Sequence, residues 1–297
     1  MISIIIPFHN EEENVSLLYK ELKEALGHIH EEYEIVYVDD GSTDKSKQEV
    51  EKLAHEDHKV KLVSLRKRFG KGKAISLGVQ ESKGDTIIFM DADLQDDPRD
   101  IPKFLEKLHT GFDVINGVRS SRQDSSIIKF YSKGGNSFLR SFLHSPFTDI
   151  NCGFKAFKRK VLDEIVIYGN NFRFIPLAAY YQGFKVGEVS VANRKRIHGV
   201  SKFGLKKPFI GFIDTITAYF LYQFSERPLH FFGIIGAIFV LIGFIILGYL
   251  GIERIIFQQL IYRRPILFVG LLAVIVGVQI TMTGFIGELV VYLHKKK

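Results

Sequence analysis

Two long apolar stretches in the last third of the chain constrain its fold more than any other feature. Leu229 to Ile252 contains no Asp, Glu, Lys or Arg, and Pro265 to Leu293 has only Gln279 and Glu288 as strongly polar residues. Each stretch exceeds the roughly 20 apolar residues with which an α-helix crosses a bilayer. A helical hairpin buried in a soluble core is the alternative, and the length of both stretches argues against it. The sequence therefore predicts two transmembrane helices, 229–252 and 265–293, joined by a short loop.

Positive charges around these helices predict their orientation. The side that holds both ends of the hairpin carries more of them than the loop: Lys206, Lys207, Arg227, Lys295, Lys296 and Lys297, against Arg254, Arg263 and Arg264. Cytoplasmic segments of membrane proteins are enriched in Lys and Arg. We therefore expect a multi-pass protein of the cell membrane, with both termini and the preceding domain in the cytoplasm.

The segment 205–228 leads into the first predicted span. Phe209 to Phe224 is apolar but contains Asp214, Thr215 and Thr217. This pattern predicts an amphipathic helix in the membrane interface, or else an ordinary helix that packs beneath the domain. We expect Glu288, in the second span, to lie at headgroup level or to pair with another helix; a functional intramembrane carboxylate is the alternative.

Short apolar, β-branched runs alternate with helical patterns from the start of the chain. The expected strands are residues 3–6, 34–38, 60–65, 86–90, 113–118 and 185–191. This alternation predicts an α/β domain, residues 1–204, with an open and mostly parallel sheet. Ligands of such sheets bind at the carboxyl ends of the strands, where the strand order reverses. The remaining residues, 229–297, would form the membrane hairpin with a short basic tail.

Carboxylates follow three of these strands, and the largest group follows the strand that ends at Met90. The groups are Glu11 to Glu13, Asp39 with Asp40, and Asp91, Asp93, Asp96 and Asp97. Crowded carboxylates repel one another unless a cation or hydrogen bonds compensate. Asp91 and Asp93 could reach a hard divalent ion that also binds the oxygens of a diphosphate. The alternatives are a solvated acidic loop and, for Asp39 and Asp40, capping of the next helix.

Two basic segments complement these carboxylates. One holds Arg66, Lys67, Arg68, Lys71 and Lys73, and the other runs from Arg194 to Lys202. Both could bind phosphates; the first could instead be a solvated helix entrance, and the second could bind lipid headgroups. The formal net charge of +7 is not concentrated on one face with stacking aromatics, so nucleic-acid binding is not expected. The single cysteine, Cys152, excludes an intramolecular disulfide.

Together these motifs resemble glycosyltransferase family 2, which has the GT-A fold. The residues that carry the resemblance are Pro7, Asn10-Glu11, Val38-Asp39-Asp40-Gly41-Ser42, Asp91-Ala92-Asp93-Leu94-Gln95 and Arg119. With its two C-terminal spans, the whole chain is similar to the membrane-anchored polyprenyl-phosphate glycosyltransferases, such as dolichyl-phosphate mannose synthases and bacterial undecaprenyl-phosphate glucosyltransferases.

The resemblance implies roles for individual residues. The nucleotide-sugar donor would be held by Pro7, Glu11, Val38, Asp40, Asp91 and Gln95, and a Mg²⁺ or Mn²⁺ ion by Asp91, Asp93 and Gln95. The catalytic set would be Asp91, Asp93, Arg119 and Arg196, and the acceptor phosphate would meet Lys129, Lys133, Arg196, Ser201 and Lys202. The chain departs from the family pattern at one position: it has Gly153 where some bacterial relatives have an Asp. The carboxylate nearest to this position in the sequence is then Asp149.

The implied reaction is the inverting transfer of a hexose from a nucleotide-sugar to a polyprenyl phosphate such as undecaprenyl phosphate. UDP-glucose is the expected donor, with GDP-mannose or a UDP-N-acetylhexosamine as alternatives, and the lipid bilayer and a second copy in a homo-oligomer are the expected partners. A processive polysaccharide synthase would need a Gln-x-x-Arg-Trp motif, and the chain has no tryptophan. A non-catalytic membrane scaffold is disfavoured because Asp93 and Arg196 are both present.

Overall fold

The chain forms two compact units, Met1–Thr215 and Ile216–Lys297, which are described separately. The computed structural model describes residues 1–119, 145–167, 169, 171–194, 207–258 and 265–295. The sequence also has a helical pattern over residues 127–143, and these residues lie outside the described ones. The segment expected to enter the membrane interface contains the helix α8 (Lys207–Tyr219) and the π-helical turn η3 (Phe220–Phe224).

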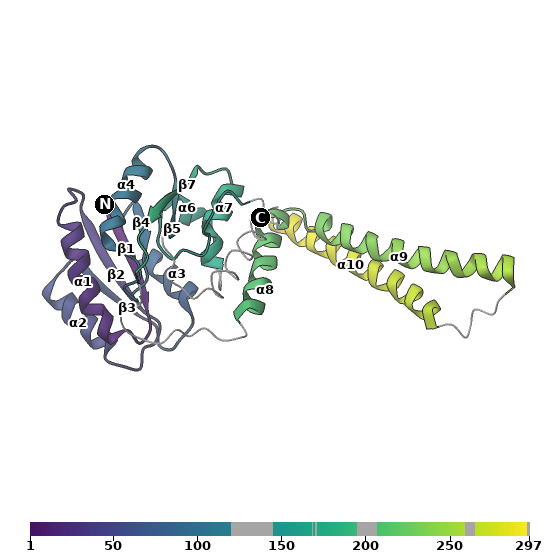
Figure 1. Cartoon of the computed structure of the whole chain (residues 1–297), viewed down its shortest axis with the longest axis horizontal. Coiled ribbons are helices and arrows are strands. Elements are labelled where there is room, and N and C mark those ends of the chain that lie inside the picture. The colour runs from purple at the N-terminus through teal and green to yellow at the C-terminus, as the bar shows by residue number, and fades with distance from the viewer. Residues whose placement is uncertain (120–144, 168, 170, 195–206, 259–264, 296–297) are drawn as a thin grey trace. The chain divides into compact units, whose positions relative to one another are not determined.

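A single sheet of seven strands is the framework of the first unit. Its strands are β1 (Ile2–Phe8), β2 (Tyr33–Asp39), β3 (Val60–Ser64), β4 (Thr86–Phe89), β5 (Val114–Arg119), β6 (Lys155–Lys158) and β7 (Val186–Val191). The strand order is β3-β2-β1-β4-β6-β5-β7 (Figure 1). All neighbours pair in parallel except β6, which is antiparallel to β4 and β5. The predicted open, mostly parallel sheet is confirmed.

Helices cover both faces of this sheet. They are α1 (Glu12–Leu26), α2 (Ser46–Glu56), α3 (Lys71–Glu81), η1 (Pro98–Asp100), α4 (Ile101–His109), α6 (Arg159–Glu164), η2 (Asn171–Phe174) and α7 (Ile175–Tyr181). Successive residues of a strand point to opposite faces. The core cluster that contains Ile4 and Ile6 of β1 includes side chains from α1, α2 and α4. On the other face, Gly78 lets α3 approach Ile5 closely: a Cβ on this glycine would lie 2.5 Å from the Ile5 Cγ2 atom.

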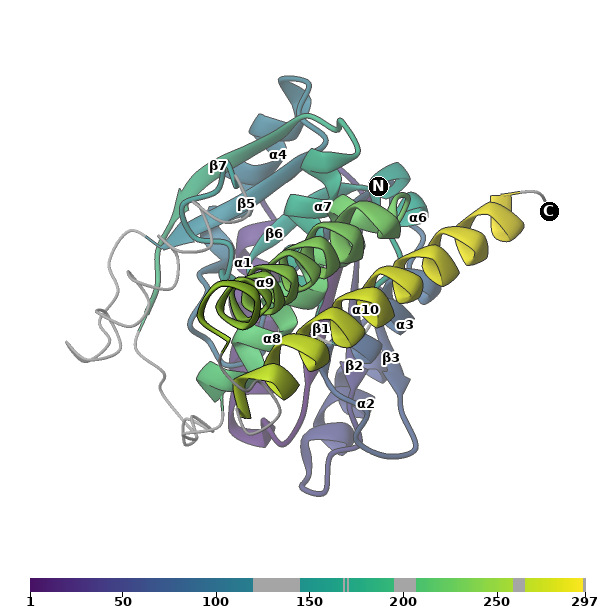
Figure 2. The same ribbon diagram turned by 90° about the vertical axis from the view of Figure 1, so that its right-hand side faces the viewer.

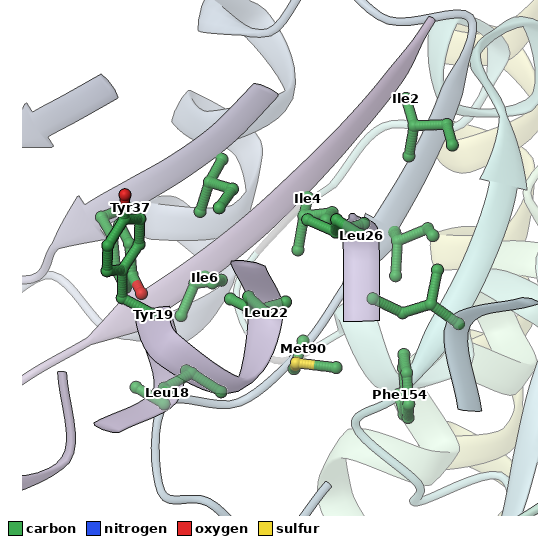
Figure 3. Packing of buried hydrophobic residues seen from close by; sticks show 14 of the residues in the cluster. Ile2, Ile4, Ile6, Leu18, Tyr19, Leu22, Leu26, Tyr37, Met90 and Phe154 are labelled. Atoms are coloured by element: carbon green, nitrogen blue, oxygen red, sulfur yellow. The ribbon is translucent and has the colours of Figure 1, made fainter. Parts of the chain in front are cut away.

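The packing between β1 and α1 also anchors the acidic loop. Leu18 and Leu22 lie on one face of α1, one turn apart, and pack with Ile4 and Ile6 in the same buried cluster (Figure 3). Met90, the residue immediately before the first carboxylate of the acidic loop, is fully buried in this cluster. Because that side chain is fixed in the core, the carboxylates that follow start from a defined position.

The second unit is a helical hairpin of α9 (Pro228–Phe257) and α10 (Pro265–Lys295), which run alongside one another (Figure 2). Both helices are long and apolar enough to cross a membrane, and only 11% of the most apolar window of each is buried. The predicted pair of apolar C-terminal helices is therefore present.

Glycines at seven-residue intervals bring the two helices together. Gly270, Gly277 and Gly284 are the buried residues of α10. A Cβ on Gly277 would lie 2.7 Å from the carbonyl oxygen of Gly236 in α9. Small residues at such contacts let helix backbones approach closely in membranes.

Glu288 of α10 caps the start of α9. Its Oε2 atom accepts a hydrogen bond of 3.2 Å from the backbone N–H of Leu229. This N–H has no partner within its own helix, because the first N–H groups of a helix lack one. The expectation that Glu288 pairs with another helix is confirmed.

We predict that Gly277→Ala destabilises the hairpin, whereas Gly248→Ala does not. The first substitution forces a methyl group against the α9 backbone, which typically costs about 1–3 kcal/mol. Gly248 has no neighbouring atom within 4 Å of its added Cβ, so it provides a control with the same change in helix propensity. The measurement is SDS-induced unfolding of the full chain in mixed micelles, followed by energy transfer between labels on α9 and α10. Equal effects of the two substitutions would contradict the packing described here.

Candidate functional site

The carboxyl ends of β1, β2 and β4 meet at one edge of the sheet, as their parallel pairing requires. A pocket at this edge is lined by Pro7, Phe8, His9, Glu11, Asp40, Arg68, Gly70, Lys71, Asp91, Ala92 and Asp93. Five predicted site residues therefore line one pocket: Pro7, Glu11, Asp40, Asp91 and Asp93. Val38 does not line it, because its side chain is fully buried and faces α3 near Gly78.

Two loops of this edge are held together by Asn10, which has a left-handed backbone conformation with φ of 57°. Its Oδ1 atom accepts a hydrogen bond of 2.8 Å from the backbone N–H of Thr43, and its own N–H donates to Ser42 Oγ at 3.1 Å. Asp39 accepts a bond of 2.8 Å from the Ser42 N–H. Asp39 thus closes this turn. It does not cap the next helix, because α2 has Lys45 as its N-cap residue and no side-chain cap hydrogen bond.

Gly41 is needed in the same turn for two reasons. Its φ is +68°, which favours glycine, and a Cβ there would lie 2.5 Å from the carbonyl carbon of Lys67. The loop after β2 can therefore contact the basic segment after β3 without an intervening side chain.

Asp40 fixes the basic segment that opens α3. Its carboxylate accepts hydrogen bonds from the backbone N–H groups of Phe69 at 2.7 Å and Gly70 at 2.9 Å, and the residue is buried. Because Arg68 and Lys71 flank these two residues, the bonds direct both cations to the pocket. The carboxylate predicted to bind the donor thus also shapes the pocket at the sheet edge.

The acidic loop after β4 is held in a constrained conformation. Leu94 is buried and has φ of 61°, an unusual value for a branched residue. The backbone N–H of Gln95 donates to Asp93 Oδ1 at 3.2 Å, and the Gln95 side-chain amide donates to the Arg194 carbonyl at 3.4 Å. Asp91 forms an ion pair with the Lys71 ammonium.

Gly153 packs directly against Asp91. A Cβ at this position would lie 2.8 Å from Asp91 Oδ2. A side chain at this position would therefore compete for the space that the Asp91 carboxylate occupies.

Asp96 and Asp97 are both buried, yet their pKa values move in opposite directions. Burial, followed by the charges of Asp91 and Asp93, raises the pKa of Asp96 to about 7. Burial alone would also raise the pKa of Asp97, but hydrogen bonds from Arg99 and Arg194 outweigh it and hold that pKa well below its usual range. The charges of Asp91 and Asp93 thus act on a buried neighbouring carboxyl group, and a cation bound beside them would offset this repulsion.

The second basic segment begins in contact with the acidic loop. Arg194 forms ion pairs with Asp97 at 2.7 Å and with Glu21 at 2.8 Å, and its backbone N–H donates to the Gln95 carbonyl at 2.9 Å. The predicted residues Arg196, Ser201 and Lys202, like Lys129 and Lys133, lie outside the described residues.

Arg119 and Asp149 form a two-bond ion pair at the same edge. The Nε atom of Arg119 donates to Oδ2 at 2.7 Å and its Nη2 atom to Oδ1 at 2.9 Å, and Asp149 is buried. Asp149, the carboxylate nearest to Gly153 in the sequence, is thus already paired with Arg119. A role for Asp149 as an unpaired base does not fit this geometry.

Sequence reasoning missed the role of a buried lysine, Lys155. Only 2% of it is exposed, and its ammonium donates to the Ile150 carbonyl at 3.0 Å and to the Asn116 side chain. Burial lowers its pKa to about 8. These bonds fix the loop that carries Asp149 and Gly153. The alternating pattern of β6, Lys-Ala-Phe-Lys, gives no sign that its first lysine points inward.

The carboxylates fit a divalent cation that is shared with a ligand rather than enclosed by protein. Among the described residues, no group of three or more His, Cys, Asp or Glu side chains is arranged to hold a metal. Mg²⁺ is usually bound through one or two carboxylates together with substrate phosphates. Asp91 and Asp93 supply two carboxylates beside a pocket lined by Arg68 and Lys71, which suits a diphosphate.

Comparison with known proteins identifies the family. Residues 3–166 match the model of Glycosyl transferase family 2, so the chain belongs to this family and the predicted resemblance is confirmed. The chain is 31% identical over 294 residues to a dodecaprenyl-phosphate galacturonate synthase of Rhizobium johnstonii, covering 97% of this chain and 87% of that protein. It is 30% identical over 289 residues to an undecaprenyl-phosphate 4-deoxy-4-formamido-L-arabinose transferase of Photorhabdus laumondii, with the same coverage.

Solved structures confirm the GT-A fold. The glucosyl-3-phosphoglycerate synthase of Mycobacterium tuberculosis, in complex with Mn²⁺ and UDP-glucose, superposes with a TM-score of 0.56 at 19% identity. The match covers 74% of this chain and 78% of that one. At this identity the likeness concerns the fold alone.

We predict that Asp149→Leu destabilises the first unit and that adding Arg119→Met reverses most of the loss. Removing one partner of a buried ion pair typically costs about 3–5 kcal/mol, because the other charge is left uncompensated. The double variant removes both charges. The measurement is denaturant unfolding of the full chain in detergent for both single variants and the double variant, which gives the coupling energy. Additive effects of the two substitutions would contradict the pairing.

Proposed function

We propose that this protein transfers a sugar from a nucleotide-sugar to a polyprenyl phosphate, such as undecaprenyl phosphate, at the cytoplasmic face of the cell membrane. The observation that carries the proposal is the pocket at the sheet edge, where Asp91 and Asp93 lie beside Arg68 and Lys71. The same chain ends in two helices long enough to span a membrane. The relatives similar to it over 97% of its length are polyprenyl-phosphate enzymes by name.

Asp91 and Asp93, with Gln95 beside them, would hold Mg²⁺ or Mn²⁺. When bound, this ion would supply positive charge to the departing diphosphate as a Lewis acid. Arg68 and Lys71 line the same pocket and can add charge-assisted hydrogen bonds to phosphate oxygens. Pro7, Glu11 and Asp40 would border the nucleoside.

The transfer needs no protein base. An oxygen of the acceptor phosphate forms a bond to the anomeric carbon, while the bond from that carbon to the diphosphate breaks and the nucleoside diphosphate leaves. A phosphate monoester has its second pKa near 6, so the attacking oxygen is already ionised at neutral pH. The engagement of Asp149 by Arg119 agrees with such a route. A direct attack of this kind inverts the anomeric configuration.

Arg119 would contribute positive charge on the acceptor side. Its Nε and Nη2 atoms are used by Asp149, which fixes the orientation of the guanidinium plane and leaves the Nη1 edge outside this pair. An arginine oriented in this way can approach a phosphate with little further loss of side-chain freedom. Arg196, Ser201, Lys202, Lys129 and Lys133 are proposed to complete the acceptor phosphate site.

The membrane arrangement is part of the proposal. The two spans would place residues 1–204 and both termini in the cytoplasm, and residues 205–228 would lie at the membrane interface. This arrangement brings a lipid-borne phosphate to the domain by diffusion in two dimensions. Catalysis then depends mainly on positioning and electrostatics. We also propose a homo-oligomer.

The identity of the donor sugar is the most specific part of the proposed function. UDP-glucose is the sequence-based expectation, and the relatives are named for galacturonate and 4-deoxy-4-formamido-L-arabinose. Relatives that share about 30% identity thus differ in sugar, so a panel of donors is required.

We predict that the full chain in detergent transfers radiolabelled sugar to undecaprenyl phosphate from one donor of a panel. The panel contains UDP-glucose, UDP-galacturonate, UDP-N-acetylhexosamines, a UDP-4-deoxy-4-formamido-L-arabinose donor and GDP-mannose, each with Mg²⁺ or Mn²⁺. The Asp93→Asn variant removes one charge of the proposed metal site, so the label in the lipid phase should fall by at least about 100-fold, as when a preorganised electrostatic contact is lost. A chelator should have the same effect.

Asp85→Asn is the matched control for this assay. It makes the same chemical change at the opposite end of β4, where Asp85 is 88% exposed. We expect transfer by this variant to equal that of the unaltered protein. Absence of label in lipid from every donor, with the protein folded and nucleotide bound, would contradict the polyprenyl-phosphate assignment.

A further inference from the structure

Lys71 occupies a special position in the donor pocket. It is the first residue of α3, and the preceding Gly70 has φ of +99° and donates its N–H to Asp40. The start of α3 is thus fixed by Asp40, the residue that follows β2. From there the Lys71 side chain reaches across to Asp91, with its ammonium in an ion pair with Oδ1 of that carboxylate.

The surroundings of Lys71 favour a cation but do not enclose it. Its ammonium also lies 5.2 Å from the centre of the Phe172 ring. The Lys71 side chain is 31% exposed and that of Asp91 is 35% exposed. Both residues line the pocket together with Asp93 and Arg68. The lysine therefore has open space beside it, on the side where a diphosphate would enter.

Two other arginines near the acidic loop pair with a different carboxylate. Arg99 and Arg194 both pair with Asp97. Lys71 instead contacts Asp91, one of the two carboxylates proposed to hold a divalent ion. A lysine ammonium and a divalent cation against one carboxylate repel each other at short range, and partial exclusion from water strengthens this repulsion.

We propose that Lys71 is a built-in counter-cation of the metal site, which neutralises Asp91 until a metal ion and the donor's diphosphate arrive together. The ammonium then moves from Asp91 to the phosphate oxygens, and the metal ion takes its place at the carboxylate. The lysine thereby makes metal and nucleotide bind cooperatively and weakens the binding of metal alone. This inference rests on the proposed function, because it requires a metal site at Asp91 and Asp93.

The arrangement has a consequence for both ligands. A nucleotide that attracts the ammonium frees Asp91 for the metal, and the metal in turn frees the ammonium for the nucleotide. Such coupling is reciprocal, and couplings of this kind typically change affinity about 5- to 150-fold.

The test measures Mn²⁺ affinity from the electron paramagnetic resonance signal of free Mn²⁺, with and without nucleoside diphosphate. The full chain in detergent is titrated with Mn²⁺ alone, with UDP and with GDP. In the unaltered protein the better nucleotide should tighten Mn²⁺ binding by at least about tenfold. In Lys71→Met, Mn²⁺ alone should bind about tenfold more tightly than in the unaltered protein, and the nucleotide should add less than about threefold.

Two further variants act as controls. Lys71→Arg keeps a cation of similar reach and should retain the cooperative binding. Lys73→Met removes the same charge from an exposed residue two positions along α3 and should bind Mn²⁺ as the unaltered protein does. Because Lys73→Met lies on the same helix and removes the same charge, a general effect on folding or on net charge would appear in it as well.

Unchanged or weaker binding of Mn²⁺ alone in Lys71→Met would overturn the inference, since Lys71 would then only stabilise the fold. The inference would also be overturned if Lys73→Met tightened the binding of Mn²⁺ alone as Lys71→Met is expected to do. Failure of the proposed metal site looks different: the unaltered protein would then bind no Mn²⁺ even with nucleotide, or would bind it as well with Asp93→Asn. That result would overturn the metal site and the role of Lys71 together.

Discussion

Repulsion among the carboxylates that follow β4 is the constraint on which the rest of the site depends. The buried side chain of Met90 fixes where the loop starts. Burial, followed by the charges of Asp91 and Asp93, raises the pKa of Asp96 to about 7. Much of the surrounding structure offsets this charge. Lys71 faces Asp91 from α3, and Arg194 neutralises Asp97 at the start of the second basic segment. The proposed divalent ion, shared with a diphosphate, would offset the negative charge that remains.

Other carboxylates at this sheet edge organise distant segments of the chain. Asp40 fixes the entrance of α3 through two backbone N–H groups, and this entrance carries Lys71 to Asp91. On the other side, Gly153 gives the Asp91 carboxylate its space, and the pairing of Arg119 with Asp149 holds an arginine at the sheet edge. The proposed donor and acceptor sides are therefore built around one loop.

Much of this could be predicted from the sequence, because the signals are local. Apolar, β-branched runs gave the strands, and parallel pairing requires their acidic ends to share an edge. The direction of β6, the contact between Lys71 and Asp91, and the inward position of Lys155 depend on residues far apart in the chain, so no spacing rule predicts them. Val38 follows the expected motif, and its position on β2 turns its side chain toward α3 near Gly78, so its predicted contact with the donor stays a prediction.

The proposed function depends most on a divalent ion that Asp91 and Asp93 would hold in contact with the diphosphate of the donor. The most direct measurement is phosphorus-31 electron–nuclear double resonance on Mn²⁺ bound to the full chain with nucleoside diphosphate. The account predicts a hyperfine coupling between Mn²⁺ and phosphorus that disappears, together with tight Mn²⁺ binding, in both Asp91→Asn and Asp93→Asn. A coupling that persists in both variants, or Mn²⁺ bound to the protein with no coupling to phosphorus, would contradict it.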